Sequence, residues 1–271
     1  MTTTNLGDQL NRIASNARGA LFAQGELAQL TFLALGYAAQ SVRDDQKDEL
    51  EIEYPIGYNP DKTVMPYVRK YSKSELLARY EYLSYTQLGV NGVLQIVTII
   101  EAMLGDVMRS VVVKYPQKLG AKRTITIQNV LEAASLQEMH LRATDALINE
   151  LSYKSPPEFA EAVKVLTGIN LLECPAFHKY VEIKATRDIH IHNRGIANEI
   201  YTRKAGSHAR VKAGAHLPIT NDYFLEAYEM CIQLTDWLEQ EMHDHWHSAE
   251  REARTQPQLN LPAPMDGGGA A

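Results

Sequence analysis

The sequence predicts an all-α protein, an antiparallel helix bundle with an N-terminal helical extension. Apolar residues recur every three or four positions over long segments, a spacing typical of amphipathic helices. Glycine, proline and asparagine turn signals cluster between those segments. Hydrophobic residues make up 45% of the 271 positions and charged residues 22%, which is ordinary for a globular protein.

The first helical pattern covers residues 6–42. Its glycines at positions 19, 25 and 36 weaken the helix and allow a break within it. Residues 44–72 are predicted to be a polar connection, because Tyr54-Pro55, Gly57 and Asn59-Pro60 are turn signals. A short extended piece is expected at 50–54. Residues 1–72 are therefore predicted to form an N-terminal helix followed by a polar connection.

A second helix is predicted over 74–113, with Ser74 as its N-cap and Glu75 as an early acid. The β-branched run 90–100 also suits a buried strand. The length of the segment favours a helix, because about forty residues continue with no turn signal beyond three glycines. Its apolar residues lie on nearly every face, as expected for a central or interface helix.

Shorter helices are predicted at 127–153, 157–168 and 175–192, after a loop at 116–122. An irregular stretch follows, marked by Gly195, Gly206 and Gly214. Thr220-Asn221-Asp222 is expected to cap a last long helix that ends near residue 254. Residues 73–255 thus form the predicted helical domain, and the proline- and glycine-rich residues 256–271 a flexible tail.

The net charge of −6 argues against a general nucleic-acid coat protein. The charge is unevenly distributed, however. Residues 178–216 hold eight Lys and Arg against three Asp and Glu, and five of the nine histidines. This basic, histidine-rich segment is a candidate anion site, although a solvated charged loop would have the same composition.

The N-terminal residues have neither a basic start nor an apolar run, so no signal peptide is expected. The most apolar stretch, 93–104, is shorter than the about 20 residues that a membrane-spanning helix needs. Cys174 and Cys231 cannot form a disulfide framework, and we interpret both as small buried apolar residues. The expectation is a cytoplasmic protein with no membrane contact.

One segment carries a recognisable chemical motif. Arg187 is followed by the acid Asp188, and His192 opens a His192-Asn193-x-Gly195 sequence where the predicted helix 175–192 stops. Two other Arg and His pairs have similar spacing, Arg203 with His208 and Arg210 with His216, but neither lies at such a junction. The Arg187 segment resembles the HEPN superfamily, which is marked by an arginine, usually a polar residue next, and a histidine after four to six intervening residues.

The resemblance covers the motif firmly and residues 76–254 loosely, by helix order. It implies an HEPN-like helical domain that forms a homodimer in which two motifs face each other. It also implies a metal-independent endoribonuclease, typically a toxin or antiviral-defence effector, with an antitoxin or other defence protein as a possible partner. No cofactor or metal is expected. The first seventy residues have no counterpart in the resemblance.

The residue types suit RNA cleavage by attack of the 2′-hydroxyl. Histidine exchanges protons near neutral pH, so we interpret His192 as the acid/base. The arginine fork binds two phosphate oxygens, so we interpret Arg187 as the phosphate clamp. Asp188 and Asn193 would orient these two, and the product would carry a 2′,3′-cyclic phosphate. The expected substrate contacts are His190, Arg194, Lys184 and Tyr201.

The two main groups do not share a helix face. Residues five apart on a continuous helix differ by about 140° in direction. The sequence therefore predicts that His192 lies at the helix end, near Asn193 and Gly195, or that Arg187 and His192 meet copies from a second subunit.

Each interpretation has an alternative. Arg187 could be a surface partner of Glu182 or Asp188, His192 a helix C-cap, and His190 the catalytic group. Tyr201 could simply pack in the interior. His243 and His247 have the spacing of zinc ligands, but no third ligand is apparent in the sequence. For the whole chain, the alternatives are a non-catalytic HEPN dimerisation or nucleotide-binding module and an unrelated helical scaffold.

Overall fold

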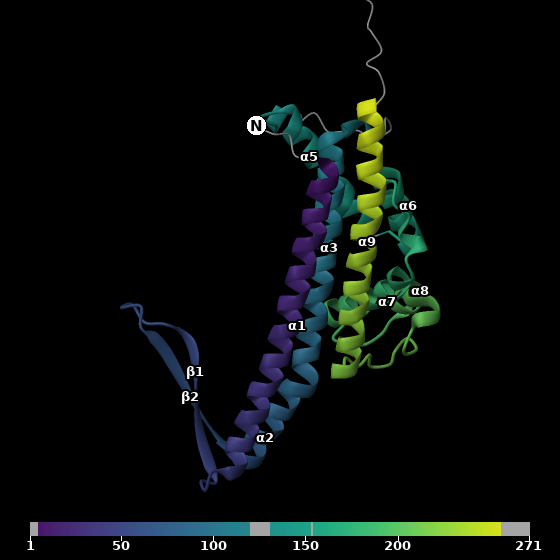
Figure 1. The fold of residues 1–271 in the computed structure, drawn as a ribbon. Helices are drawn as coiled ribbons and strands as arrows, with labels where there is room; N and C mark the ends of the chain where they lie inside the picture. Colours follow the sequence, from purple (N-terminus) through teal and green to yellow (C-terminus); the bar gives the residue numbers. More distant parts are fainter. Residues whose placement is uncertain (1–4, 120–130, 153, 256–271) are drawn as a thin grey trace, which may run out of the picture.

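Three long helices form the centre of the protein: α1 (Leu6–Asp44), α3 (Leu88–Lys114) and α9 (Asn221–Thr255). In this computed structural model they lie side by side, and α1 runs antiparallel to the other two (Figure 1). The structure describes residues 5–119, 131–152 and 154–255. The expected tail 256–271, residues 120–122 of the expected loop, and positions 127–130 and 153 of one expected helix lie outside these ranges. The predicted all-α class is confirmed, with one small sheet added.

Helix α1 is unbroken, so the break allowed by its glycines does not occur. The Asn5 side chain caps its start by accepting a hydrogen bond from the backbone N of Gly7 at 2.7 Å. Leu10, Ala14 and Leu21 are buried on one face, and packing of this face against α3 and α9 stabilises the helix more than its glycines weaken it.

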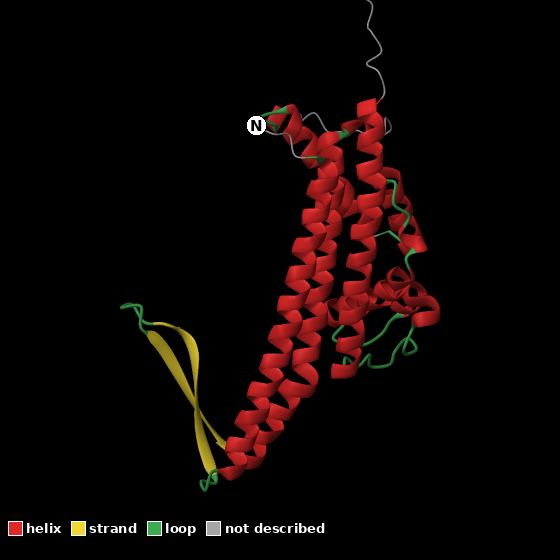
Figure 2. Cartoon of the chain, in the orientation of Figure 1, coloured by secondary structure: helices red, strands yellow, loops and turns green. Residues whose placement is uncertain are grey.

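The connection after α1 is a β-hairpin, and the expected short extended piece was too short. Strand β1 (Glu49–Tyr58) pairs with the antiparallel strand β2 (Val64–Ser72). In β1, acids at 49, 51 and 53 alternate with larger residues at 50, 52 and 54, a period of two that indicates a strand. The hairpin projects from the bundle where α1 ends (Figure 2).

The predicted helix at 74–113 is present, but it begins slightly earlier and is interrupted once. Helix α2 (Lys73–Tyr82) is capped by Ser72 rather than Ser74, and Ser72 forms a reciprocal capping box with Glu75. A π-helical turn (Leu83–Gln87) then joins α2 to α3.

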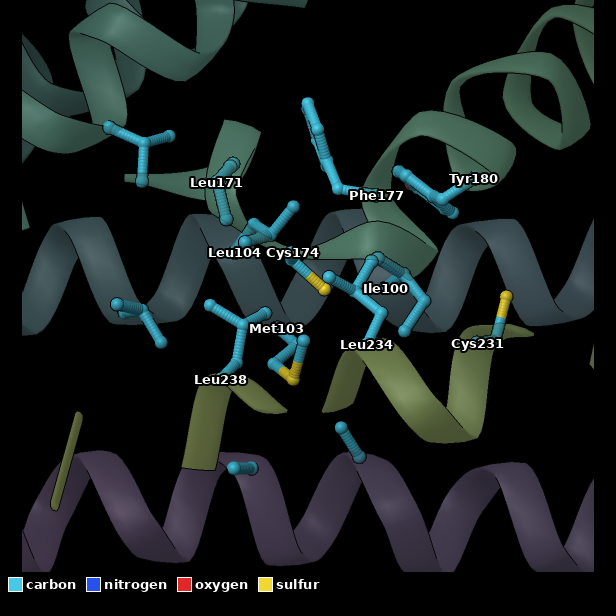
Figure 3. Close-up of a cluster of buried hydrophobic side chains, with 14 of the residues drawn as sticks. Ile100, Met103, Leu104, Leu171, Cys174, Phe177, Tyr180, Cys231, Leu234 and Leu238 are labelled. Carbon is cyan, nitrogen blue, oxygen red and sulfur yellow. The ribbon is translucent and has the colours of Figure 1, made fainter. Parts of the chain in front are cut away.

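Shorter elements pack against α3 and α9 either directly, as α7 does, or through one another, as α8 does by packing on α7. They are the helices α5 (Leu136–Ser152), α6 (Pro156–Thr167), α7 (Pro175–His192) and α8 (Glu199–Ala205), with 3-10 turns at Pro116–Leu119, Leu171–Glu173 and Gly206–His208. Side chains of α3, α7 and α9 meet in the main core (Figure 3). Within the described residues, no helix has the length and apolarity needed to cross a lipid bilayer.

Candidate functional site

The candidate site is built around the C-terminal half of α7. Pro175 occupies the first turn of this helix, where its missing N–H costs nothing. The helix ends at His192, as the sequence predicts. The backbone N–H groups of Asn193 and Gly195 both donate to the Ile189 carbonyl, at 2.9 and 3.2 Å. Arg194 and Gly195 both have positive φ, 52° and 78°, so the chain turns sharply after the motif.

The turn is held by the segment that precedes α9. The N–H of Ala197 donates to the Ala215 carbonyl at 2.9 Å, and the N–H of Leu217 donates to the Gly195 carbonyl at 2.8 Å. Nε2 of His190 lies 2.9 Å from the Leu217 carbonyl oxygen. A carbonyl can only accept, so this bond requires a hydrogen on Nε2. The end of α7 is therefore an ordered surface.

Arg187 points toward α3 and is largely buried, with its side chain 14% exposed. Its guanidinium donates to the carboxylate of Glu101, and Lys184 donates to the same carboxylate. Nε of Arg187 is buried and has no hydrogen-bond partner within the described part of the chain. Asp188 Oδ1 lies 3.4 Å from it. The Arg187 guanidinium is thus held by Glu101, an acid of the same chain.

Asp188 lies among three cations. Its carboxylate is 4.0 Å from Lys184 Nζ, 3.9 Å from Lys204 Nζ and 3.4 Å from Arg187 Nε. Together with Glu101 these residues form what we call the α3/α7 ion-pair cluster, made of Glu101, Lys184, Arg187, Asp188 and Lys204. Three cations and two anions leave the cluster with one net positive charge.

His192 and Arg194 are exposed at the end of α7, whereas Arg187 is turned inward. The expected placement of His192 at the helix end is confirmed. Asn193 donates from its side-chain amide to the Ile196 carbonyl, so it stabilises the turn. Since α7 is continuous from 175 to 192, Arg187 and His192 lie on different faces of it.

His190 lies behind the turn rather than on the surface beside His192. Burial lowers the pKa of its imidazole, and the nearby His216 acts in the same direction, while the bond to the Leu217 carbonyl opposes the shift. The ring of His216 lies edge-on to His190, with centroids 6.4 Å apart. His190 therefore supports the end of α7 in the folded chain, and its ring is only partly accessible.

Tyr201 is not placed to stack on RNA, because it is 1% exposed. Its hydroxyl donates to the Glu182 carboxylate at 2.9 Å and accepts from the Arg210 backbone N–H at 3.0 Å. Burial raises the pKa of this hydroxyl. The expectation of a substrate contact is corrected: Tyr201 packs inside the protein and connects α8 to α7.

Glu182 is the centre of this buried network. It is 0% exposed and accepts from Thr186, Tyr201, Tyr223 and the Arg210 Nε at 2.8–3.0 Å. The Arg210 guanidinium also stacks 3.6 Å from the centre of the Tyr223 ring. Glu182 is thus a partner of Arg210 and not the surface partner of Arg187 that we considered.

The sequence reasoning overlooked Glu101, Lys204 and Arg210 as members of the site. Glu101 is an acid inside the otherwise apolar run 99–104, and Glu182 has apolar neighbours on both sides. An acid between apolar neighbours needs a cation as its partner when the helix packs against others. This pattern could have indicated that Glu101 and Glu182 each pair with a basic residue. Arg210 and His216 have the spacing of the motif, and both lie against α7: Arg210 pairs with Glu182, and the His216 ring lies edge-on to His190.

The histidines of α9 do not form a metal site with other described residues. The rings of His243 and His247 stack at 4.3 Å, and His247 Nε2 lies 3.2 Å from Asp8 Oδ1. Within the ranges that the structure describes, no three His, Cys, Asp or Glu side chains are grouped to hold a metal ion. His247 instead links α9 to the start of α1.

Cys174 and Cys231 are free and buried, as expected from their interpretation as small apolar residues. Burial raises the pKa of the Cys231 thiol to about 12, so this sulfur stays protonated and unreactive near neutral pH. Neither thiol is placed as a surface nucleophile.

Comparisons with known proteins identify no relative of the chain. No protein family, no curated protein and no solved structure matches the chain. Any functional proposal therefore rests on the residues of the chain itself.

Proposed function

We propose that the chain is a metal-independent endoribonuclease, with His192 as the group that moves protons and Arg187 as the group that holds the scissile phosphate. The observation that carries the proposal is the ordered, exposed position of His192 at the end of α7. An exposed imidazole on an ordered helix end can approach a phosphodiester, and histidine is the side chain best suited to proton transfer near neutral pH.

The proposed reaction is an internal transfer. A base removes the proton of the RNA 2′-hydroxyl, and the 2′-oxygen forms a bond to the adjacent phosphorus. The bond from phosphorus to the 5′-oxygen breaks, and that oxygen takes up a proton. The products are a 2′,3′-cyclic phosphate and a 5′-hydroxyl. Arginine stabilises the charge that develops on the phosphorane oxygens.

The charges at this end of the molecule support RNA as the substrate. Arg194 and His192 are exposed at the end of α7, and Lys184, Lys204 and Arg187 belong to the α3/α7 ion-pair cluster. This basic region stands out on a chain of net charge −6. A local basic patch binds phosphate while the acidic remainder disfavours unspecific coating of nucleic acid.

A second copy of the chain would complete the site. Arg187 and His192 diverge on α7, so a phosphodiester held by both is most simply bound where two motifs face each other. Three isoleucines close to His192 in sequence are exposed, Ile191 by 48%, Ile196 by 39% and Ile200 by 51%. Exposed apolar residues beside a charged site are typical of an interface, and we propose that these isoleucines belong to the homodimer.

The test is cleavage of labelled single-stranded RNA and transfer RNA by the purified chain in the presence of a chelator. We expect cleavage products with 2′,3′-cyclic phosphate ends. His192→Ala should abolish cleavage, and it should relieve the growth arrest expected of a toxin when the chain is expressed. His243→Ala is the matched control, since His243 is an exposed histidine on α9; it should cleave normally. Equal cleavage by both variants, or cleavage only with added divalent metal, would rule out the proposal.

One contact favours a second candidate, a non-catalytic module that dimerises and binds nucleotides or RNA. The carboxylate of Glu101 forms an ion pair with the Arg187 guanidinium, so the charge of this proposed phosphate-binding group is already neutralised in the single chain. If Glu101 stays in place in the assembled protein, Arg187 acts as a structural residue. RNA or nucleotide binding without any product, even at high protein concentration, would favour this candidate over the nuclease.

A further inference from the structure

A cavity of about 250 Å³ lies between α3, α5, α6 and α7, beside the candidate site. Its walls are mainly apolar and come from all four helices. The apolar lining includes Leu104 and Met108 of α3, Ile148 of α5, Phe159 of α6 and Phe177 of α7. In Figure 3 the side chains of Leu104, Phe177 and Tyr180 can be followed from α3 and α7. Such a cavity selects a ligand with an apolar body.

The rim of the cavity is basic. Lys154, Lys184 and Lys204 line it, together with a single acid, Glu101. Glu101 is already paired with Arg187 and Lys184, so its charge is neutralised. Among the described residues Lys204 makes one long ion pair, 3.9 Å to Asp188, which leaves its ammonium with donors to spare. The rim therefore attracts an anion.

Tyr180 also lines the cavity, and its hydroxyl is buried without a hydrogen-bond partner in the described ranges. Burial raises the pKa of this hydroxyl well above its ordinary value, so it remains a donor. The hydroxyl oxygen is itself inaccessible, so it does not reach an occupant of the cavity, and Tyr180 contributes its ring to the cavity wall.

We propose that this cavity binds a small amphipathic carboxylate of the size of a medium-chain fatty acid. The hydrocarbon chain lies among the apolar walls, and the carboxylate lies at the rim with Lys184 and Lys204. The volume of the cavity limits the size of the ligand. It is slightly below the about 300–1,000 Å³ of pockets that bind drug-sized ligands, so the ligand is smaller than these. The proposal does not depend on RNA cleavage, because it concerns another ligand, and the cavity shares Glu101, Lys184 and Lys204 with the α3/α7 ion-pair cluster.

The first experiment measures binding to the full chain by calorimetry, with octanoate as the probe. Octylammonium and octanol are the controls, because they have a similar chain but a positive or a neutral head. We expect octanoate to bind at one saturable site, and the two controls to bind at least about tenfold more weakly, the difference expected when a charge-assisted hydrogen bond is lost. No saturable binding of octanoate, or equal binding of the three probes, would overturn the proposal.

Two pairs of variants locate the site. Val181→Phe adds bulk inside the cavity, and Val165→Phe makes the same change at an exposed position of α6. Lys204→Gln removes a rim charge, and Lys164→Gln removes an exposed charge of α6. We expect Val181→Phe to abolish octanoate binding and Lys204→Gln to weaken it about tenfold, with both α6 controls unchanged.

Lys204→Gln keeps the test decisive if Val181→Phe fails to fold. Octanoate binding that survives in every folded member of the two pairs places the ligand elsewhere and overturns the assignment of this cavity. RNA cleavage by the same preparations is measured without octanoate. Failure to cleave RNA therefore tests the nuclease proposal alone, and failure to bind octanoate tests the ligand proposal alone.

Discussion

Arg187 on α7 donates a hydrogen bond to Glu101 on α3, a residue 86 positions earlier in the chain. The pair fixes the arginine of the motif against the central helix. It also places an acid where the proposed reaction needs a phosphate. The balance between Glu101 and an incoming phosphate therefore decides what Arg187 can do.

Glu101→Gln is expected to increase RNA affinity about fivefold. A charge near a phosphate site at the protein surface is worth about 1 kcal/mol, and the substitution removes a competing negative charge. Filter binding of a single-stranded RNA by the His192→Ala background measures this without cleavage. Glu26→Gln on α1 is the control for total charge. An unchanged or lower affinity would mean that Glu101 does not restrain Arg187.

Mixing Arg187→Ala protein with His192→Ala protein is expected to restore part of the cleavage activity. If each site takes its arginine from one copy and its histidine from the other, a mixed dimer contains one intact site. The mixture is dissociated and reassembled, and cleavage is compared with that of each variant alone. Restored activity requires sites built from both copies. An inactive mixture in which mixed dimers have formed would mean that Arg187 and His192 of one site belong to the same copy.

Glu182→Ala is expected to lower the free energy of unfolding by about 3–5 kcal/mol. The substitution leaves Arg210 partly buried without its carboxylate and removes the acceptor used by two tyrosine hydroxyls. Urea denaturation measures the change, and Glu173→Ala at an exposed position is the control. Replacing Glu182 and Arg210 together by methionine should recover much of the loss. A loss below about 1 kcal/mol would show that the network is not structural.

His190 is expected to make the fold less stable as the pH falls below about 6.5, its ordinary pKa. Burial lowers the pKa of His190 in the folded protein, so the unfolded chain binds more protons between the folded and unfolded pKa values. Stability from this residue is complete above the unfolded pKa and is lost as the pH falls toward the folded pKa. His190→Gln should flatten this dependence in thermal unfolding between pH 7 and about 5, and the exposed His208→Gln should leave it unchanged.

Two glycines of long helices should respond in opposite ways to alanine. A Cβ at Gly92 of α3 would lie 2.4 Å from the Phe224 ring, whereas a Cβ at Gly36 of α1 meets nothing within 4 Å. Gly92→Ala should destabilise the protein by about 1–3 kcal/mol through overpacking. Gly36→Ala should stabilise it by about 0.5–1 kcal/mol because alanine favours helix. Urea denaturation of both variants measures the pair, and a shift of the same sign in both would contradict the packing of α3 on α9.

The helices could be predicted because their pattern is local. The apolar repeat of 6–42 and the stop signal at Asn193 and Gly195 specify α1 and the end of α7 within a few residues. The hairpin was missed because its turn residues looked like an irregular connection, while the alternation at 49–54 spans only a few positions. Strand pairing depends on a partner segment, and that information is not local.

The candidate site was predictable in part. The position of His192 at the helix end followed from its neighbours in sequence. The partner of Arg187 did not, because Glu101 comes from another helix and only the packing of α7 on α3 brings the two together. For the same reason Tyr201, close to the motif in sequence, turned out to be an interior residue bonded to Glu182.

The π-helical turn at Leu83–Gln87 has a consequence for the projecting hairpin. A π turn completes about one helical rotation with one residue more than an α turn, so it accommodates the extra residue without rotating α2 relative to α3. Deleting one residue within 83–87 would therefore give an uninterrupted α-helix and leave the hairpin pointing in the same direction. Deleting one residue within α2 itself would instead rotate the start of that helix by about 100°, so the π turn is a position where the chain can change length without redirecting the strands.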